Sequence, residues 1–281
     1  PGTRLDYQGR IRFWEKRGEQ WQKLHPGGKQ EGGWKFLPET DPRGHLTKPS
    51  DVAIGSSGDA WVADTGNFRL QRFNLKGGWL KPISIGIRGG PAKACPRSLA
   101  LGRGVIHCVV HPPNGNGEVV LQARDRDGNL VQQKSICPAI GEPVVKVACN
   151  SKGEIFLYQS KTKTNRGWQE SPGLSRLDAN YNVQLAVGGD NVQGLYPPGN
   201  PSDVLNLKPQ EDIVPYGQGL LVPCNGKVYR INPQLVVEGQ YRLKLKPGRV
   251  ASQRLEDFGG SCIGGSILYL ADMGNQCLQR A

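Results

Sequence analysis

The sequence has few of the features that mark a catalytic or a membrane-spanning chain. No apolar run approaches the roughly 20 residues that a membrane-spanning helix needs. The motifs GxSxG, the phosphate-binding P-loop and HExxH do not occur, and only four of the 281 residues are histidine. A serine nucleophile elbow, a nucleotide-phosphate loop and a zincin helix are thereby excluded, and no cofactor is expected.

Cysteine is present without the spacings of a metal site or a disulfide framework. There is no CxxC pair, and no histidine stands at zinc-ribbon spacing. Apolar runs such as VIHCVV predict buried thiols that act as small hydrophobic side chains. Cys95 and Cys137 both precede proline in the connectors ACPRS and ICPAI, so a disulfide between them stays open. The cysteines number seven, an odd count, and stand at 95, 108, 137, 149, 224, 262 and 277.

Acidic residues are too few to balance the basic ones. The chain has 36 Lys and Arg against 24 Asp and Glu, a net charge of +12, and a pI near 9.5. This balance implies attraction to acidic surfaces, whether nucleic acid, anionic lipid, acidic polysaccharide or an acidic protein. Because the basic residues are spread along the chain, a soluble protein with scattered charges is the alternative.

The sequence begins PGTRLDYQG, with neither Met nor a signal-like apolar stretch. We expect a mature, processed or excised segment. Removal of an upstream signal would favour a secreted or periplasmic location, and the compartment is otherwise open.

Glycine and proline are frequent and evenly spread, with 39 and 21 residues, which predicts many turns between short strands rather than disorder. The stretch WVADTGNFRLQRF, residues 61–73, aligns without a gap with YLADMGNQCLQRA, residues 269–281. Asp64, Gly66 and Asn67 match Asp272, Gly274 and Asn275. The sequence therefore contains an internal repeat.

Weaker copies share the plan of a strand, a Gly turn and a second strand, followed by a third strand, a polar turn and a fourth strand. First strands fall near residues 53, 100, 148, 213 and 262, an interval of about 47 residues, which is typical of one four-stranded β-propeller blade. We predict a single all-β propeller domain over residues 1–281. Six blades are favoured and five are the alternative, with the ring closed by N- and C-terminal strands.

One repeat is longer than the others because of two Pro- and Gly-rich insertions, at about residues 161–173 and 188–208. Long loops in a compact domain are often functional. Trp168 and Tyr196 lie in these insertions and are candidate anchors for a partner, unless they pack against their own loops.

The run KPSDVAIGSSGDAWVADTGNFRLQRF, residues 48–73, resembles an NHL repeat. The resemblance implies an NHL-type β-propeller across nearly the whole chain. We interpret the repeat's polar residues as structural: Gly66 and Asn67 would supply positive φ in the turn, and Asp64 would accept bonds from the turn's amides and from Arg69. Cys277 replaces this arginine in the C-terminal copy, so we expect Arg10 or Arg12 to reach Asp272.

Some NHL-like propellers are enzymes, notably the lyase that cleaves peptidyl-hydroxyglycine with metal-binding histidines. Here His107 and His111 lie on one face of a predicted strand and could share a metal ion, but no third ligand is visible. His25 and His45 lie in N-terminal loops. A metal-dependent lyase is therefore the second alternative.

Other members of the family bind single-stranded RNA on a basic propeller face, which makes RNA binding the first alternative. We expect a non-enzymatic scaffold that docks a protein partner, or a larger assembly, through its loops and a basic surface. The candidate binding residues are Arg10, Arg12, Trp14, Phe68, Arg69, Arg72, Trp168 and Tyr196.

Overall fold

A computed structural model describes the side chains of residues 46–55, 59–74, 79–139, 143–160, 173–187, 213–222 and 228–240, and only the backbone of further strands. By contact density the chain forms two compact units. The N-terminal unit comprises residues 1–99 and 110–113, and the C-terminal unit comprises residues 100–109 and 114–281.

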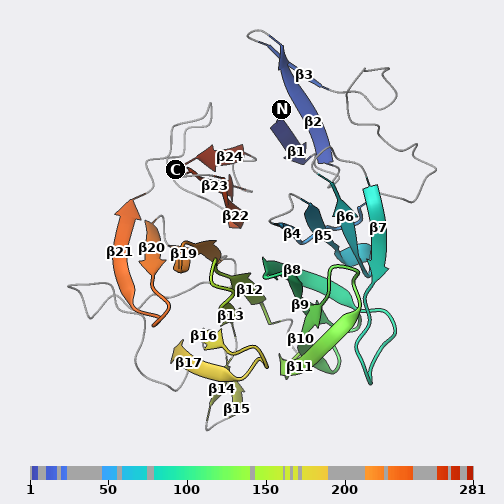
Figure 1. The fold of residues 1–281 in the computed structure, drawn as a ribbon, viewed down its shortest axis with the longest axis vertical. Helices are drawn as coiled ribbons and strands as arrows, with labels where there is room; N and C mark the ends of the chain where they lie inside the picture. Colours follow the sequence, from blue (N-terminus) through green and yellow to red (C-terminus); the bar gives the residue numbers. More distant parts are fainter. Residues whose placement is uncertain are drawn as a thin grey trace. The chain divides into compact units, whose positions relative to one another are not determined.

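The fold is all-β, with four sheets of four antiparallel strands, each ordered as its strands follow one another along the chain (Figure 1). The only described helix is a short 3-10 turn, η1 (Thr65–Asn67). The first two sheets are β4 (Asp51–Ile54), β5 (Ala60–Asp64), β6 (Arg69–Phe73), β7 (Trp79–Ser84), and β8 (Cys95–Gly102), β9 (Val105–His111), β10 (Glu118–Arg124), β11 (Leu130–Pro138). The next two are β12 (Val145–Cys149), β13 (Ile155–Gln159), β16 (Gly173–Leu177), β17 (Val183–Gly188), and β18 (Val214–Tyr216), β19 (Gly219–Cys224), β20 (Lys227–Ile231), β21 (Val237–Arg242).

Three-stranded sheets occur near both termini. They are β1 (Gly2–Leu5), β2 (Ile11–Arg17), β3 (Gln20–Lys23), and β22 (Phe258–Gly264), β23 (Ile267–Asp272), β24 (Cys277–Arg280). The number of blades, the closure of a ring and the single domain stay predictions. No described helix has the length and apolarity needed to cross a membrane.

The predicted repeat plan is confirmed at the level of strands. β4, β8, β12, β18 and β22 each lie at or beside one of the five predicted first-strand positions. The first insertion falls between the second and third strands of its sheet, as expected, and forms the hairpin β14 (Thr162–Thr164) and β15 (Gly167–Gln169). The second insertion, at residues 188–208, lies almost wholly outside the described residues.

Sheets of the C-terminal unit pack face to face. One hydrophobic core joins the β8–β11 sheet to the β12–β17 sheet and contains Val109, Val147 and Leu157. A second core joins the β12–β17 sheet to the β18–β21 sheet and contains Phe156 and Leu220. Because side chains alternate between the faces of a strand, adjacent residues 156 and 157 serve different cores, and β13 is buried on both faces.

The third-to-fourth-strand turns of these three sheets share one five-residue loop. Its first residue, Asp125, Asp178 or Asn232, accepts backbone N–H bonds from the third and fifth residues through its side chain. The fourth residue has positive φ, and is a glycine in the first loop only; Tyr181 (φ 62°) and Leu235 (φ 58°) occupy this position in the others. Both of these side chains are buried, so each of the two turns also contributes a side chain to the hydrophobic core.

The β4–β7 sheet differs in one respect. Val52 and Ile54 on β4 are 56% and 62% exposed, whereas Val147 and Cys149, at the matching positions before the first turn of the β12–β17 sheet, are buried. The match follows from the same turn bond, Gly55 N–H to Asp59 O in one sheet and Asn150 N–H to Glu154 O in the other. This face of β4 is therefore apolar and open.

The open disulfide alternative is wrong. Cys95 and Cys137 are both thiols. They lie on β8 and β11, which are the two edge strands of one sheet with β9 and β10 between them. At about 4.8 Å per strand, the two backbones are roughly 14 Å apart, whereas a disulfide needs Cα atoms within about 7 Å.

The expected role of Gly66 and Asn67 is also corrected. Neither has positive φ; the left-handed residue of this turn is Phe68 (φ 55°). Gly66 is instead required by a close approach, because a Cβ there would lie 2.7 Å from both the carbonyl oxygen and Cγ2 of Thr47. Its own N–H donates to that carbonyl at 2.8 Å.

Substitution Gly66→Ala should destabilise the protein by about 1–3 kcal/mol, because the new methyl group meets backbone that cannot rotate away. Urea unfolding measures the change. Gly89→Ala is the control, since a Cβ at Gly89 meets no atom within 4 Å and only its positive φ opposes the change. Equal losses in the two variants would contradict the close-approach explanation.

Candidate functional site

The carboxylate of Asp64, at the end of β5, lies at the centre of a buried polar network. The residue is 0% exposed. Its Oδ1 accepts the backbone N–H of Thr47 at 2.6 Å. Its Oδ2 accepts Asn67 Nδ2 at 2.9 Å, Arg69 Nε at 2.7 Å and Gln71 Nε2 at 2.9 Å. The predicted bond from Arg69 is present, but the main-chain donor is Thr47, before β4, rather than an amide of the turn.

The network continues across the sheet. Gln71 is fully buried, and its Oε1 accepts the indole N–H of Trp79 on β7 at 2.9 Å. Asp64 and Arg69 are paired residues of β5 and β6, so the sheet register itself sets the ion pair. A carboxylate holding four donors has little capacity left to accept a proton or a ligand, and this arrangement favours a structural role.

Arg72, a candidate binding residue, is engaged within its own sheet. Its guanidinium pairs with Asp59, with Nε 3.0 Å from Oδ2. Its Cζ lies 5.2 Å from the centroid of the Trp61 ring, a cation–π distance. Arg72 therefore stabilises the far end of the β4–β7 sheet, away from Asp64.

Side-chain bonds tie the Asp64 end of this sheet to the start of β8. Thr65 Oγ1 and Ser50 Oγ both donate to Pro96 O, at 2.5 and 3.1 Å. Asp51 Oδ2 accepts the backbone N–H of Leu99 at 2.7 Å. Three segments, residues 46–50, 65–69 and 85–98, thus meet at one end of the sheet.

These three segments carry basic residues and no acidic ones. We call the set the basic end: Lys48, Arg69, Arg88, Lys93 and Arg97. All are exposed except Arg69, which is partly buried. The neighbouring acids are occupied, since Asp64 is buried and Asp51 binds the N–H groups of Val52 and Leu99. Among the residues that the structure describes, the basic end thus exposes charge of one sign.

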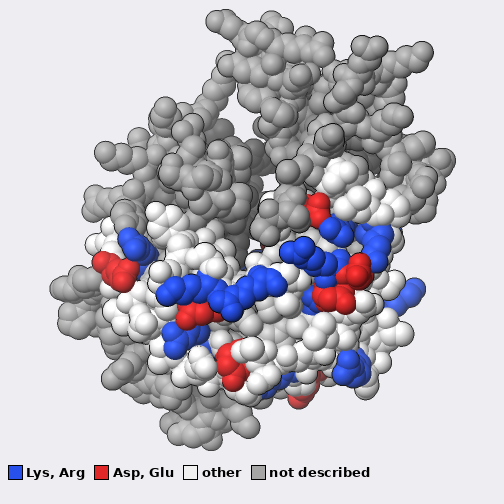
Figure 2. Space-filling view, in the orientation of Figure 1, with Lys and Arg blue, Asp and Glu red and all other residues white. Residues whose placement is uncertain are grey.

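Basic groups elsewhere are mixed with acids. On the face shown in Figure 2, several groups of Lys and Arg side chains lie beside an Asp or Glu side chain. In the C-terminal unit Arg126 stands between Asp125 and Asp127, and Lys152 is two residues from Glu154. Net charge alone would therefore not locate a binding surface.

His107 and His111 are buried on β9. His107 Nδ1 lies 2.8 Å from the hydroxyl of Tyr181, and the two rings are edge to face. Burial lowers the pKa of His107 to about 4, and burial together with Arg97 lowers the pKa of His111 to about 4. In the part of the chain that the structure describes, no group of three His, Cys, Asp or Glu residues could hold a metal ion.

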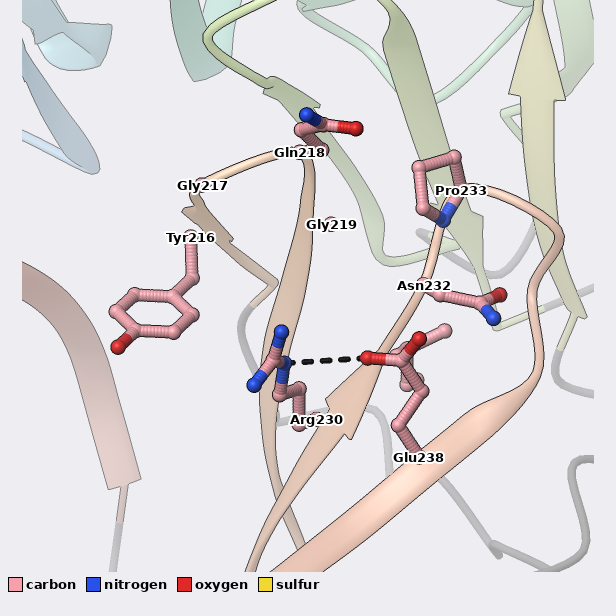
Figure 3. A pocket seen from close by; sticks show the side chains of 9 residues that line it. Tyr216, Gly217, Gln218, Gly219, Arg230, Asn232, Pro233 and Glu238 are labelled. Carbon is pink, nitrogen blue, oxygen red and sulfur yellow. Dashed lines mark ion pairs between the residues drawn. The ribbon is translucent and has the colours of Figure 1, made fainter.

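A shallow pocket lies in the β18–β21 sheet (Figure 3). Its lining includes Tyr216, Arg230 and Glu238. Arg230 Nε pairs with Glu238 Oε2 at 3.2 Å, and its Cζ lies 5.9 Å from the Tyr216 ring centroid. The two charged groups of this pocket are therefore paired with each other.

Several predicted residues fall where side chains are not described: Arg10, Arg12, Trp14, Trp168, Tyr196, Asp272, Gly274 and Asn275. The backbone register does pair Asp272 with Cys277, as it pairs Asp64 with Arg69. The equivalence of the two repeats is thus confirmed, whereas the role of Arg10 or Arg12 beside Asp272 stays a prediction.

Sequence analysis missed Lys48, Arg88, Lys93 and Arg97. A signal was available, because the connector IGIRGGPAKACPRS, residues 85–98, has three basic residues and no acid. The candidate binding residues Arg69 and Arg72 have aromatic neighbours in the sequence, whereas these four basic residues have none.

Comparison with protein-family models matches one family. Residues 46–73 match the model of the NHL repeat. This match covers Lys48–Phe73, on which the resemblance rested, and all the residues of the Asp64 network except Trp79. A comparison with curated protein sequences gives no match.

Solved structures similar to this chain include propeller-like enzymes. A virginiamycin B lyase from Staphylococcus aureus is 14% identical, over 99% of this chain and 92% of that one, with a TM-score of 0.46. A glutaminyl cyclase from Myxococcus xanthus is 11% identical, over 79% and 84%, with a TM-score of 0.46. These likenesses concern the fold alone, and neither activity is carried over to this chain.

A double-mutant cycle tests the Asp64 network. Asp64→Asn should cost about 3 kcal/mol of unfolding free energy, because it leaves the Arg69 guanidinium without its counterion. Asp64→Asn with Arg69→Gln should cost less than the sum of the single changes. Urea unfolding of all four proteins gives the coupling, and strict additivity would show that the ion pair contributes nothing.

The buried imidazoles of His107 and His111 should make the folded protein less stable in acid. Their pKa values are about 4 in the folded protein, against a usual 6.5, so below 6.5 the unfolded chain binds protons that the folded chain does not. Stability therefore falls as the pH drops from 6.5 to 4, by up to about 1.4 kcal/mol per pH unit for each histidine.

In His107→Gln, unfolding free energy should fall less steeply over this pH range than in the wild type, and His111→Gln should behave alike. Urea titrations at several pH values measure the slopes. Slopes unchanged in both variants would show that these imidazoles do not resist protonation.

Proposed function

We propose that this chain is a non-enzymatic NHL-propeller binding domain that docks an acidic protein partner. The observation that carries the proposal is the basic end of the β4–β7 sheet, where the described segments present Lys and Arg without an exposed acid. A surface of one sign raises both the rate and the selectivity of association with a partner of the opposite sign.

The engagement of the repeat's own polar groups supports binding over catalysis. The Asp64 carboxylate accepts hydrogen bonds from four donors, and Arg72 pairs with Asp59. His107 is bonded to Tyr181 within the sheet stack. These groups have structural partners. The exposed charged groups of the basic end are its Lys and Arg side chains.

Binding is tested on the purified full chain by fluorescence anisotropy. The probes are a labelled Asp/Glu-rich peptide, its Asn/Gln counterpart, and a single-stranded RNA of equal charge. We expect saturable binding to the acidic peptide that weakens as salt rises, and no binding to the neutral counterpart. Failure to bind the acidic peptide would overturn the proposal, and preference for the RNA would favour the alternative of RNA binding.

A further inference from the structure

Resting on the proposed function, we infer that the basic end itself is the docking surface, and that it takes an extended, carboxylate-rich segment of the partner protein. Lys48, Lys93 and Arg97 are the side chains assigned to contact the carboxylates. Each is exposed and makes no ion pair with the residues that the structure describes. Within that part of the chain, no carboxylate neutralises the three charges by an ion pair.

The frame beneath these side chains is fixed by hydrogen bonds between segments distant in sequence. Gly66 N–H donates to Thr47 O at 2.8 Å, which holds the segment of Lys48 against the turn. Ile85 N–H donates to Phe68 O at 2.9 Å, and Ala94 N–H donates to Ile85 O at 2.8 Å. The bond between Ala94 and Ile85 closes the loop between β7 and β8 at its base, immediately beside Lys93.

Hydrogen bonds also fix the backbone before and after Arg97. Its neighbour Pro96 accepts the hydroxyl bonds of Ser50 and Thr65, and Leu99 donates to Asp51. The three basic residues thus come from segments joined by at least one bond to each neighbour. A surface fixed in advance loses less conformational entropy when a partner binds.

The same residues favour a peptide over a nucleic acid. Surfaces that bind single-stranded nucleic acid stack successive bases on several aromatic side chains. The three segments contain one aromatic residue, Phe68, and it is half-buried. Arg and Lys bind carboxylates by charge-assisted hydrogen bonds without such stacking. The surface suits a chain of carboxylates spaced along an extended backbone.

The C-terminal unit offers a matched set of basic residues for comparison. Arg103, Arg126 and Lys152 are equally exposed, but acids stand close to Arg126 and Lys152 in the sequence. Arg103 lies across Gly153, where a Cβ would be 2.6 Å from its Nε. Neutralising these three changes the net charge by the same amount as neutralising Lys48, Lys93 and Arg97.

The experiment compares K48Q/K93Q/R97Q with the control R103Q/R126Q/K152Q, each as the full chain. Affinity for the labelled Asp/Glu-rich peptide is measured at physiological ionic strength, and thermal unfolding checks the fold. Because exposed ion pairs are individually weak, we expect the first variant to bind about tenfold more weakly than wild type. The control should stay within about twofold.

If the triple variant unfolds, K93Q/R97Q replaces it, because it leaves the left-handed backbone of Lys48 unchanged. Its loss of affinity for the peptide should be smaller than tenfold and larger than that of the control. Equal losses in test and control variants would overturn the assignment of this surface while leaving the proposed function standing. A wild type that does not bind the peptide would overturn the proposed function as well. If the wild type binds the RNA more tightly than the peptide and K48Q/K93Q/R97Q loses that binding, the inference of a protein partner is overturned.

Discussion

The buried carboxylate of Asp64 is the constraint on which the Asp64 end of the β4–β7 sheet depends. A charge that is 0% exposed is tolerated only when hydrogen bonds replace its water. The four donors come from the segment before β4, the turn after β5, and β6. Satisfying one charge therefore orders three pieces of chain, and the first of them carries the exposed Lys48.

Packing of sheet on sheet imposes a second constraint, in the C-terminal unit. Residues of β13 alternate between two cores, so the strand has no polar face. β9 is also buried from Ile106 to His111, so His107 lies among buried side chains with the Tyr181 hydroxyl as partner. Burial lowers the pKa of this histidine to about 4.

The fold was largely predictable because the repeat recurs at a similar interval except in the one longer unit, and each turn leaves a Gly or polar signal. The details of the turns were less accessible. Positive φ at Phe68, Tyr181 and Leu235 breaks the rule that glycine or asparagine fills such positions, since these side chains gain burial or a fixed direction in return. The need for Gly66 came from the approach of Thr47, 19 residues earlier (66 − 47), and no local pattern records a contact of that kind. The connector of residues 85–98 shows three of the basic residues in the sequence, whereas their association with Lys48 and Arg69 depends on tertiary hydrogen bonds.

The two insertions were expected to carry function, yet the basic end lies on the copy of the repeat that matches the NHL model. The repeat's own polar residues, Asp64, Asn67 and Gln71, are turned inward and bonded to one another. Residues of the connecting segments are under no such demand, and their side chains project from the frame that the repeat supplies. A regular repeat can thus carry a specific surface, because the structural residues fix the backbone while the connectors set the charge.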